Sequence, residues 1–376
     1  MPFDVAIARD ETPKAAVAQA VGLLGGMRSF VKSGERVLIK PNFLISENRP
    51  GVVTTGAVIA AVAEQVLAAG AQPIIGEAGS AAKGLDAFRN VGVFDFAQQH
   101  GVPMMNLNED EMVEVDIPGA KVFPKAKVAK TALEADKIIS LPVLKTHDQC
   151  WVSFGIKNVK GIIPAEEKMR SHKLGVEQAI VDLNRRFPPA LVIIDGTWGL
   201  EGLGPAHGTP VKMDLIIASP NALASDTVAT KVIGLDPKRI KHLRYAAAAG
   251  LGPKSMDEIR VLGCPIESVQ RKFKTAQQAV EEQYKEMGIE VVSKDVCSGC
   301  WTEFRDIYYT LKDNRARLQG FTFVLGKVEN PPKGDKVVVL GNCAKAVAAC
   351  GAYCPGCPPH HLDIADTLLK LIGQKA

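Results

Sequence analysis

Short runs of apolar and β-branched residues alternate along the chain with amphipathic segments. The predicted strands of the first two thirds are Val5–Ala8, Val37–Lys40, Pro73–Glu77, Lys137–Leu141, Leu191–Asp195 and Leu215–Ala218. Helical patterns between them include Thr12–Val31, Ala57–Ala69 and Gly175–Arg186. Strands that alternate with helices favour a sheet covered on both faces. The pattern therefore predicts an α/β fold with a large doubly wound, mainly parallel sheet.

A second, smaller α/β pattern follows a polar helix predicted at Arg271–Met287. Its predicted strands are Glu290–Ser293, Phe321–Leu325 and Lys336–Leu340, with helices near Glu303–Gln319 and His361–Ile372. A chain of 376 residues is long for one core. We therefore expect an α/β domain over 1–270, a helical connector over 271–289 and a C-terminal α/β domain over 290–376.

The composition is that of an ordinary globular protein, with 47% hydrophobic and 23% charged residues. A net charge of +4 gives no reason to expect nucleic acid or a membrane as partner. No run approaches the roughly 20 apolar residues of a membrane span, and no signal peptide is evident. We expect a cytoplasmic protein, in which clustered cysteines are ligands or redox groups. The oligomeric state is not indicated.

Six of the eight cysteines lie after residue 296, in three short motifs. Cys-Ser-Gly-Cys holds Cys297 and Cys300, and Gly-Asn-Cys-Ala holds Cys343. The third motif contains Cys350, Cys354 and Cys357. Thiolate clusters bind soft metals, and iron–sulfur clusters take four cysteines. The two Cys-x-x-Cys pairs are further apart than in zinc ribbons, so zinc is the less favoured alternative.

The order of these motifs resembles the proximal [4Fe–4S] site of nickel–iron hydrogenase small subunits and of the related small subunit of complex I. The resemblance covers about the last 80 residues. It implies a [4Fe–4S] cluster with four ligands, Cys297, Cys300, Cys343 and Cys357. Two cysteines, Cys350 and Cys354, have no counterpart among these ligands. Cys354 could replace Cys357, or both thiols could belong to a second cluster or a redox pair. Alternatively, Cys350 is a small buried residue on a helix face.

Five segments of the first 265 residues recur together in one known family: Ile39–Asn42, Leu141–His147, Gly155–Gly161, Ile194–Gly196 and Ala222–Ala229. On these segments the region resembles domain-of-unknown-function family 362. Members of this family are often iron–sulfur proteins, so the resemblance implies a fold and an association with clusters, but no established reaction.

Cations and amides gather near the predicted strand ends, where open α/β sheets bind ligands. Such groups suit a carboxylate or phosphate. The candidate substrate-binding residues are Lys40, Asn42, Lys145, His147, Lys157 and Asn158. His147, Lys145 and His207 are the catalytic candidates, with Gly196–Gly208 expected as a flexible loop. The alternative interpretation makes Lys157 a solvated charge, His207 a surface residue, and Asp195 and Asp226 capping residues.

The favoured hypothesis is an electron-transfer protein or redox enzyme with one [4Fe–4S] cluster. Its larger domain would bind an anionic small molecule or a redox partner protein. Two alternatives remain open: a non-redox enzyme with a structural metal site, and an electron- or cluster-delivery protein without a substrate of its own.

Overall fold

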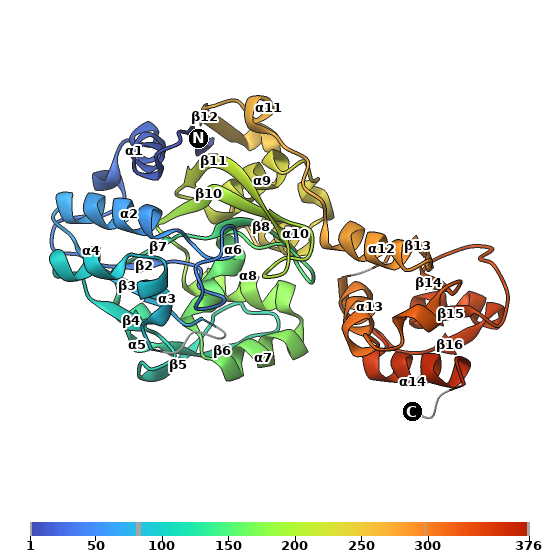
Figure 1. The fold of residues 1–376 in the computed structure, drawn as a ribbon. Helices are drawn as coiled ribbons and strands as arrows, with labels where there is room; N and C mark the ends of the chain where they lie inside the picture. The colour runs from blue at the N-terminus through green and yellow to red at the C-terminus, as the bar shows by residue number, and fades with distance from the viewer. Residues whose placement is uncertain (1, 80–83, 297, 374–376) are drawn as a thin grey trace. The chain divides into compact units, whose positions relative to one another are not determined.

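The computed structural model describes residues 2–79, 84–296 and 298–373. The chain divides into two compact units. The large unit comprises residues 1–146 and 152–273, and the C-terminal unit comprises residues 147–151 and 274–376. Each unit has its own sheet (Figure 1).

The sheet of the large unit has the strand order β12-β1-β11-β10-β7-β2-β3-β4 within the described residues, and β8 and β9 extend it beside β10. Only β11 runs antiparallel to its neighbours along this path. The strands are β1 (Phe3–Arg9), β2 (Arg36–Lys40), β3 (Gln72–Glu77), β4 (Met104–Asn106), β7 (Lys137–Ser140), β8 (Val143–His147), β9 (Trp151–Val152), β10 (Leu191–Glu201), β11 (Thr209–Ser219) and β12 (Ile259–Gly263).

Both faces of this sheet are covered, because neighbouring residues of one strand enter different cores. Val37 and Ile39 of β2 pack with helices α1 (Pro13–Leu23) and α2 (Gly56–Ala68). Leu38, between them, packs with α8 (Val176–Arg186) in another core. Figure 1 shows α2 and α8 on opposite sides of the central strands. The predicted doubly wound, mainly parallel α/β fold is confirmed.

The remaining elements of the large unit are mostly short. A separate antiparallel pair consists of β5 (Met112–Asp116) and β6 (Lys125–Ala129). The other α-helices are α3 (Asp86–Asn90), α4 (Phe94–Gln99), α5 (Lys130–Glu134), α6 (Gly155–Asn158), α7 (Ala165–Leu174), α9 (Ala222–Val232), α10 (Lys241–Ala248) and α11 (Ile266–Val269). Short 3-10 turns are η1 (Met27–Ser29), η2 (Val159–Ile162), η3 (Pro237–Arg239) and η4 (Met256–Glu258).

The C-terminal unit contains a parallel sheet of β13, β14, β15 and β16 in sequence order within the described residues. Its strands are β13 (Glu290–Lys294), β14 (Thr322–Gly326), β15 (Val337–Leu340) and β16 (Ala352–Cys354). Its helices are α12 (Ala276–Glu286), α13 (Ser298–Thr310) and α14 (His361–Leu371), with 3-10 segments η5 (Arg315–Leu318) and η6 (Asn342–Cys350). The short β16 has too few apolar residues to stand out in the sequence.

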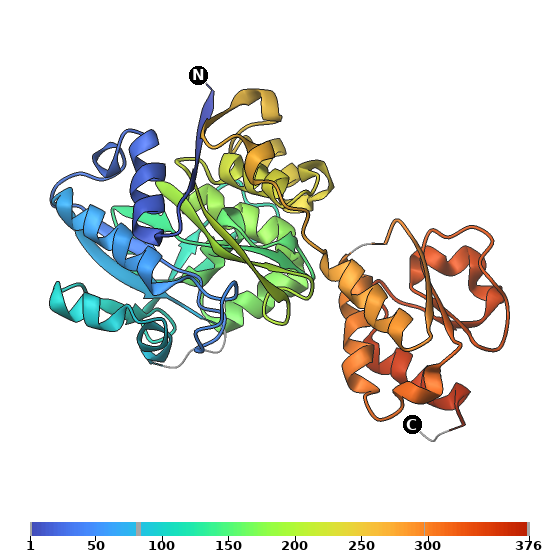
Figure 2. The same cartoon turned by 45° about the horizontal axis from the view of Figure 1, so that its top comes forward.

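The expectation of a loop over Gly196–Gly208 was wrong for residues 196–201, while residues 202–208 do connect two strands. Residues 196–201 continue β10, which forms a long hairpin with β11 (Figure 2). Glycine suits this crowded hairpin, since a Cβ at Gly199 would lie 2.6 Å from the Phe273 ring. The expected helix at Arg271–Met287 is also shorter, because it begins at Ala276 behind a capping box of Thr275 and Gln278.

No helix among the described residues is long and apolar enough to cross a membrane.

Candidate functional site

The central strands of the large sheet create a position where ligands commonly bind. From β2 the chain continues outward through β3 and β4, and it then returns on the other side of β2 as β7. The order therefore reverses between β2 and β7, whose last residues Lys40 and Ser140 are paired. Open α/β sheets bind ligands beyond the carboxyl ends of strands at such a switch point.

A buried ion pair occupies this edge. Lys40 ends β2, Glu77 ends the adjacent β3, and Lys40 Nζ donates to Glu77 Oε2. Lys40 Nζ also donates to Pro41 O (2.8 Å) and Asn158 Oδ1 (3.2 Å). Burial lowers the pKa of Lys40 and raises that of Glu77, while their mutual attraction opposes both shifts. The contact thus offsets part of the desolvation cost of both groups.

A second buried lysine lies at the same edge, and no carboxylate among the described residues contacts it. Lys145 of β8 is 1% exposed, and its Nζ donates to Asn42 Oδ1 and to Val52 O, both at 2.7 Å. Burial, followed by the charge of Lys157, lowers the pKa of Lys145 to about 7, although Glu77 opposes the shift. A lysine amine with this pKa is half neutral near neutral pH.

Asn158 connects these groups. Its Oδ1 accepts from Asn42 Nδ2 (3.2 Å), and its Nδ2 donates to Ser140 Oγ (2.9 Å) and Lys40 O (3.3 Å). Asn158 ends the short helix α6, which Asp226 caps by accepting from Gly155 N (2.8 Å) and Ile156 N (2.9 Å). Asp226 is therefore a capping residue, as the alternative interpretation of the sequence has it.

Gly161 leaves the space that the ion pair needs. A Cβ at this position would lie 2.2 Å from Glu77 Oε2 and 2.3 Å from Lys40 Nζ. The Gly161 carbonyl also accepts from Ala78 N at 2.8 Å, so the backbone of η2 lies directly against the end of β3. Glycine is the one residue type that allows this close approach.

Four of the expected substrate-binding residues therefore meet in one network: Lys40, Asn42, Lys145 and Asn158. Lys157 is half-buried and acts on the pKa values of Lys40 and Lys145. Asp195, expected as an alternative cap, is buried and accepts from Thr55 N at 2.8 Å. We refer to Lys40, Asn42, Glu77, Lys145, Lys157, Asn158 and Lys168 as the lysine cluster.

Two members of the lysine cluster were missed by the sequence analysis, Glu77 and Lys168. Lys168 Nζ donates to Ala78 O. Burial lowers the pKa of Lys168 to about 8, although the Glu77 carboxylate opposes the shift. The position of Glu77 at a strand end was a usable signal, but Lys168 lies within helix α7 and had none.

The two candidate histidines lie elsewhere. His147 is 6% exposed at the end of β8, and its Nδ1 is 2.8 Å from Asp148 Oδ1 in the following turn. That segment, His147–Trp151, groups with the C-terminal unit. His207 is exposed in the connection between β10 and β11.

In the C-terminal unit the cysteine motifs follow the carboxyl ends of parallel strands. Cys343 follows β15, and Cys357 follows β16. Cys300 lies in the first turn of α13, after β13. Cys297 lies outside the described residues. Since the carboxyl ends of parallel strands share one edge of a sheet, this topology gathers the motifs there.

Contacts between the loops support this arrangement. Gly341 has a φ of 87°, and a Cβ there would lie 3.4 Å from Cys300 Sγ and 3.6 Å from Gly356 O. Asn342 N donates to Gly356 O (2.8 Å), while Asn342 Oδ1 accepts from Gly356 N (2.9 Å). The loops that carry Cys343 and Cys357 are therefore hydrogen-bonded together beside Cys300.

The two additional cysteines differ from Cys343 and Cys357 in exposure. Cys350 and Cys354 are buried, whereas Cys343 and Cys357 are exposed. Burial raises the pKa of the Cys354 thiol, although a hydrogen bond with Thr367 of α14 opposes the shift. The Cys354 side chain therefore packs beneath α14.

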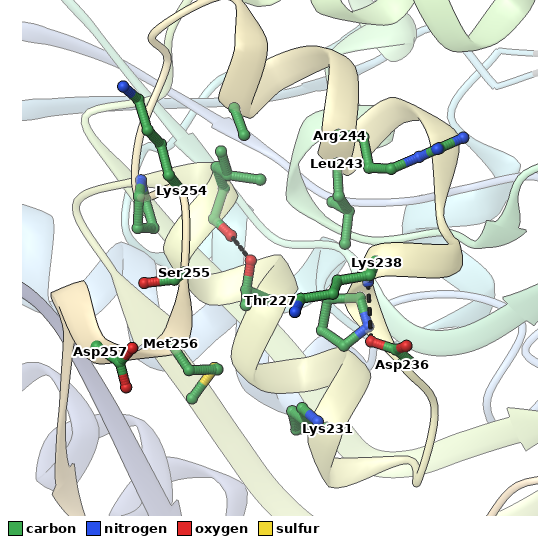
Figure 3. A pocket seen from close by; sticks show the side chains of 14 residues that line it. Thr227, Lys231, Asp236, Lys238, Leu243, Arg244, Lys254, Ser255, Met256 and Asp257 are labelled. Atoms are coloured by element: carbon green, nitrogen blue, oxygen red, sulfur yellow. Dashed lines mark hydrogen bonds between the residues drawn. The ribbon is translucent and has the colours of Figure 1, made fainter.

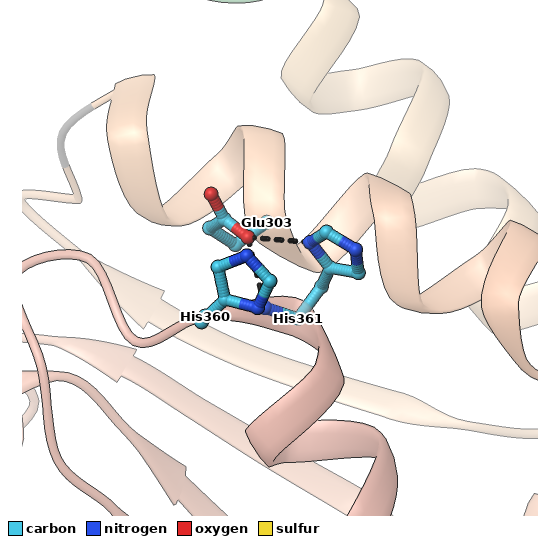
Figure 4. A group of neighbouring side chains, drawn as sticks. All are labelled: Glu303, His360 and His361. Atoms are coloured by element: carbon cyan, nitrogen blue, oxygen red, sulfur yellow. Dashed lines mark hydrogen bonds and ion pairs between the residues drawn. The ribbon is translucent and has the colours of Figure 1, made fainter. Parts of the chain in front are cut away.

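Glu303, His360 and His361 form a polar group near the same motifs (Figure 4). Glu303 Oε2 accepts from His361 N and lies 2.8 Å from His361 Nδ1. His360 Nδ1 accepts from Leu362 N and caps α14. The potential ligand atoms lie within 4.8 Å of one another, so the group could hold a metal ion. In its present geometry it connects α13 to the start of α14.

A surface pocket of about 300 Å³ lies in the large unit among α9, η3, α10 and η4 (Figure 3). Its lining includes Lys231, Lys238 and Arg244. Thr227 Oγ1 donates to Leu223 O within α9. None of the candidate substrate-binding, catalytic or metal-binding residues of the sequence analysis lines this pocket.

Fold and sites together define a two-unit α/β protein with a buried lysine cluster and a separate cysteine-rich sheet edge. Residues 37–231 match the family model "Domain of unknown function (DUF362)", and the chain belongs to this family. The matched range includes every member of the lysine cluster and ends before the cysteine motifs.

A thylakoid-associated protein of Synechocystis sp. is 34% identical over 259 residues, which are 67% of this chain and 79% of that relative. The lactate racemase apoprotein of Thermoanaerobacterium thermosaccharolyticum aligns over 99% of this chain and 92% of its own, with 10% identity and a TM-score of 0.40.

Proposed function

We propose that this chain is an iron–sulfur protein that carries a [4Fe–4S] cluster in its C-terminal unit and binds a small anion at the lysine cluster. The observation that carries the first part is the contact of the Gly341 and Gly356 loops beside Cys300. The ligands are Cys297, Cys300, Cys343 and Cys357. A bound cluster of this kind supplies single-electron transfer.

The described thiols fit a cluster better than a single zinc ion. Tetrahedral zinc, with Zn–S bonds of about 2.3 Å, holds its sulfurs roughly 3.8 Å apart. Among the described cysteines, no three sulfurs lie within 4.8 Å of one another. A cubane is wider than one ion and holds its ligands further apart. Backbone N–H groups near Gly341 and Gly356 would tune its potential.

The anion site is supported by an excess of positive charge. In the described part of the chain, Glu77 is the carboxylate whose charge acts on Lys40, Lys145 and Lys168. Lys157 adds a further cation. Even where Lys145 is neutral, Lys40, Lys157 and Lys168 are three cations with one carboxylate, and a carboxylate or phosphate ligand would stabilise them.

Anaerobic purification with iron and sulfide analysis tests the cluster. We expect a brown protein with about four irons and four sulfides per chain, and an EPR signal after reduction. Cys343→Ser should lose most of the iron. The matched variant Cys354→Ser should retain it, because Cys354 packs beneath α14. A colourless protein with stoichiometric zinc would overturn the proposal.

Thermal shift measurements test the anion site independently. Phosphate, sulfate and small carboxylates should raise the melting temperature of the wild type. Lys157→Gln should weaken this shift, whereas Lys212→Gln should not, since Lys212 has a 55% exposed side chain on β11. Equal shifts in both variants would count against an anion site at the lysine cluster.

The buried lysines also favour a second candidate, a non-redox enzyme in which the large unit performs the chemistry and the metal is structural. Under this alternative, Cys343→Ser should lower stability while the anion-induced shift persists. If Cys343→Ser loses substrate turnover but still binds anions, the result favours the redox proposal instead.

A further inference from the structure

The two fully buried lysines differ in the number of hydrogen-bond acceptors around Nζ. Lys40 has three: Pro41 O, Asn158 Oδ1 and Glu77 Oε2. Three acceptors match the three N–H bonds of an ammonium group. Lys145 has two in the described part of the chain, the oxygens of Asn42 and Val52. Two acceptors match the two N–H bonds of a neutral amine and leave its lone pair unused.

The charges around these lysines favour the same assignment. Lys40 contacts the Glu77 carboxylate, which holds a proton on the amine. Lys145 contacts neutral oxygens and experiences the positive charge of Lys157. Burial and a neighbouring cation are the two conditions that activate lysine nucleophiles in enzymes.

The half-buried members of the lysine cluster suggest how a ligand approaches. Lys40 and Lys145 are at most 1% exposed, whereas Asn42 and Lys157 are half-buried. A ligand that enters past these two residues meets the Lys157 cation and the amide that binds Lys145. An anionic group and a reactive group on one small molecule could therefore be bound together.

We propose that Lys145 is a nucleophile and that the ligand is a small carboxylate or phosphate that also carries an aldehyde or ketone, which Lys145 binds as an imine. This inference rests on the proposed anion site. The lone pair of Nζ attacks the carbonyl carbon, and the oxygen takes up a proton to give a carbinolamine. Loss of the second amine hydrogen and of the hydroxyl group, together as water, then forms the C=N bond without any oxidant or reductant.

Reductive trapping in the full-length protein tests the proposal. The probes are glyoxylate, glycolaldehyde phosphate and uncharged formaldehyde, each with cyanoborohydride, and peptide mass spectrometry locates the product. At pH 7, we expect Lys145 to react at least about 10-fold faster than exposed Lys212, because a pKa lowered to about 7 leaves about half of the Lys145 amine neutral. Either glyoxylate or glycolaldehyde phosphate should label Lys145 faster than formaldehyde does. The faster probe identifies the charged group of the ligand as a carboxylate or a phosphate.

Asn42→Asp provides a variant with a predictable direction. It places a carboxylate where Asn42 Oδ1 lies 2.7 Å from Lys145 Nζ, which favours the ammonium form. Labelling of Lys145 at pH 7 should fall about 10-fold and recover at higher pH. The same pH dependence can be measured on the wild type, so the test does not depend on the folding of a variant. Labelling of wild-type Lys145 should reach half of its maximum near pH 7.

Three results would overturn the inference: an unmodified Lys145 in protein whose Lys212 reacts, labelling of Lys145 at pH 7 no faster than labelling of Lys212, or anionic probes that react no faster than formaldehyde. Thermal stabilisation by phosphate is measured separately. If phosphate raises the melting temperature but no imine is trapped, Lys145 is not a nucleophile and the anion site stands. If only formaldehyde is trapped and phosphate does not raise the melting temperature, the anion site is rejected.

Discussion

The chemical state of each residue in the lysine cluster depends on its immediate partners. Lys40 and Lys145 are both buried, yet one contacts a carboxylate and the other contacts neutral oxygens. Gly161 permits the first contact, since a side chain there would occupy the same space. Small changes at these positions should therefore have specific effects.

Gly161→Ala should destabilise the protein by about 1–3 kcal/mol, the usual cost of overpacking. The added methyl group would collide with Glu77 and Lys40 and separate the ion pair. Urea unfolding measures the change. The control is Gly22→Ala in α1, where no atom lies within 4 Å of the new Cβ and a small gain is expected. Equal stabilities of the two variants would contradict the packing argument.

Lys145→Met should alter the pH dependence of stability. The wild-type lysine has a pKa lowered to about 7 in the folded state, against an ordinary value of 10.5. Between these pH values the unfolded chain binds more protons, so the free energy of unfolding of the wild type should rise with pH relative to the variant. Below pH 7 the difference should be constant. Urea unfolding at pH 6, 7, 8 and 9 measures the free energy of unfolding of both proteins. A difference between them that is the same at all four pH values would refute the lowered pKa.

At the scale of elements, both sites lie beyond the carboxyl ends of parallel strands. In the large unit, β2, β3 and β8 carry Lys40, Glu77 and Lys145. The helix that supplies Asn158 has only four residues and depends on the Asp226 cap. A helix this short is not stable by itself, so its cap should control the site from a distance.

Asp226→Ala should lower the free energy of unfolding by about 1–2 kcal/mol, as for other lost caps. It should also weaken phosphate binding, since α6 positions Asn158. Denaturant unfolding and a phosphate titration measure these two effects. As the control, Asp236→Ala removes an exposed cap from η3, and it should change neither the free energy of unfolding nor phosphate binding strongly. Normal phosphate binding by a destabilised Asp226→Ala would show that α6 does not set the site.

At the scale of the whole molecule, each unit holds its own candidate site around its own sheet. The lysine cluster lies in the unit that matches the family model, whereas the cysteine motifs lie beyond the match. Separate cores allow each ligand to stabilise the unit that binds it.

Calorimetry should therefore resolve two unfolding transitions. Iron chelation should lower one transition, because metal binding contributes directly to the folding of a small unit. Phosphate should raise the other, by about 2.7 kcal/mol at 100 times its dissociation constant. Cys264→Ser, outside the motifs, should keep both transitions unchanged. A single transition that responds equally to chelator and phosphate would contradict independent stabilisation.

The sequence by itself indicated the central strands of the large sheet and several residues of the lysine cluster. Alternating apolar runs identify β2, β3 and β7, because strands buried on both faces must be apolar throughout. The same reasoning placed Lys40 and Asn42 at a strand end. The sequence reasoning failed within Gly196–Gly208, where residues 196–201 continue β10. Glycine in a crowded hairpin and glycine in a loop look alike in a sequence.

Only the tertiary structure decided which groups act together. Glu77 lies 37 residues from Lys40, and Asn42 lies 103 residues from Lys145, yet both pairs are in contact. The protonation of a buried lysine depends on burial and on the charges that folding brings near it, not on its neighbours in sequence. The sequence therefore specified which residue types were available for chemistry, and the fold determined that Lys40 pairs with a carboxylate while Lys145 contacts neutral oxygens.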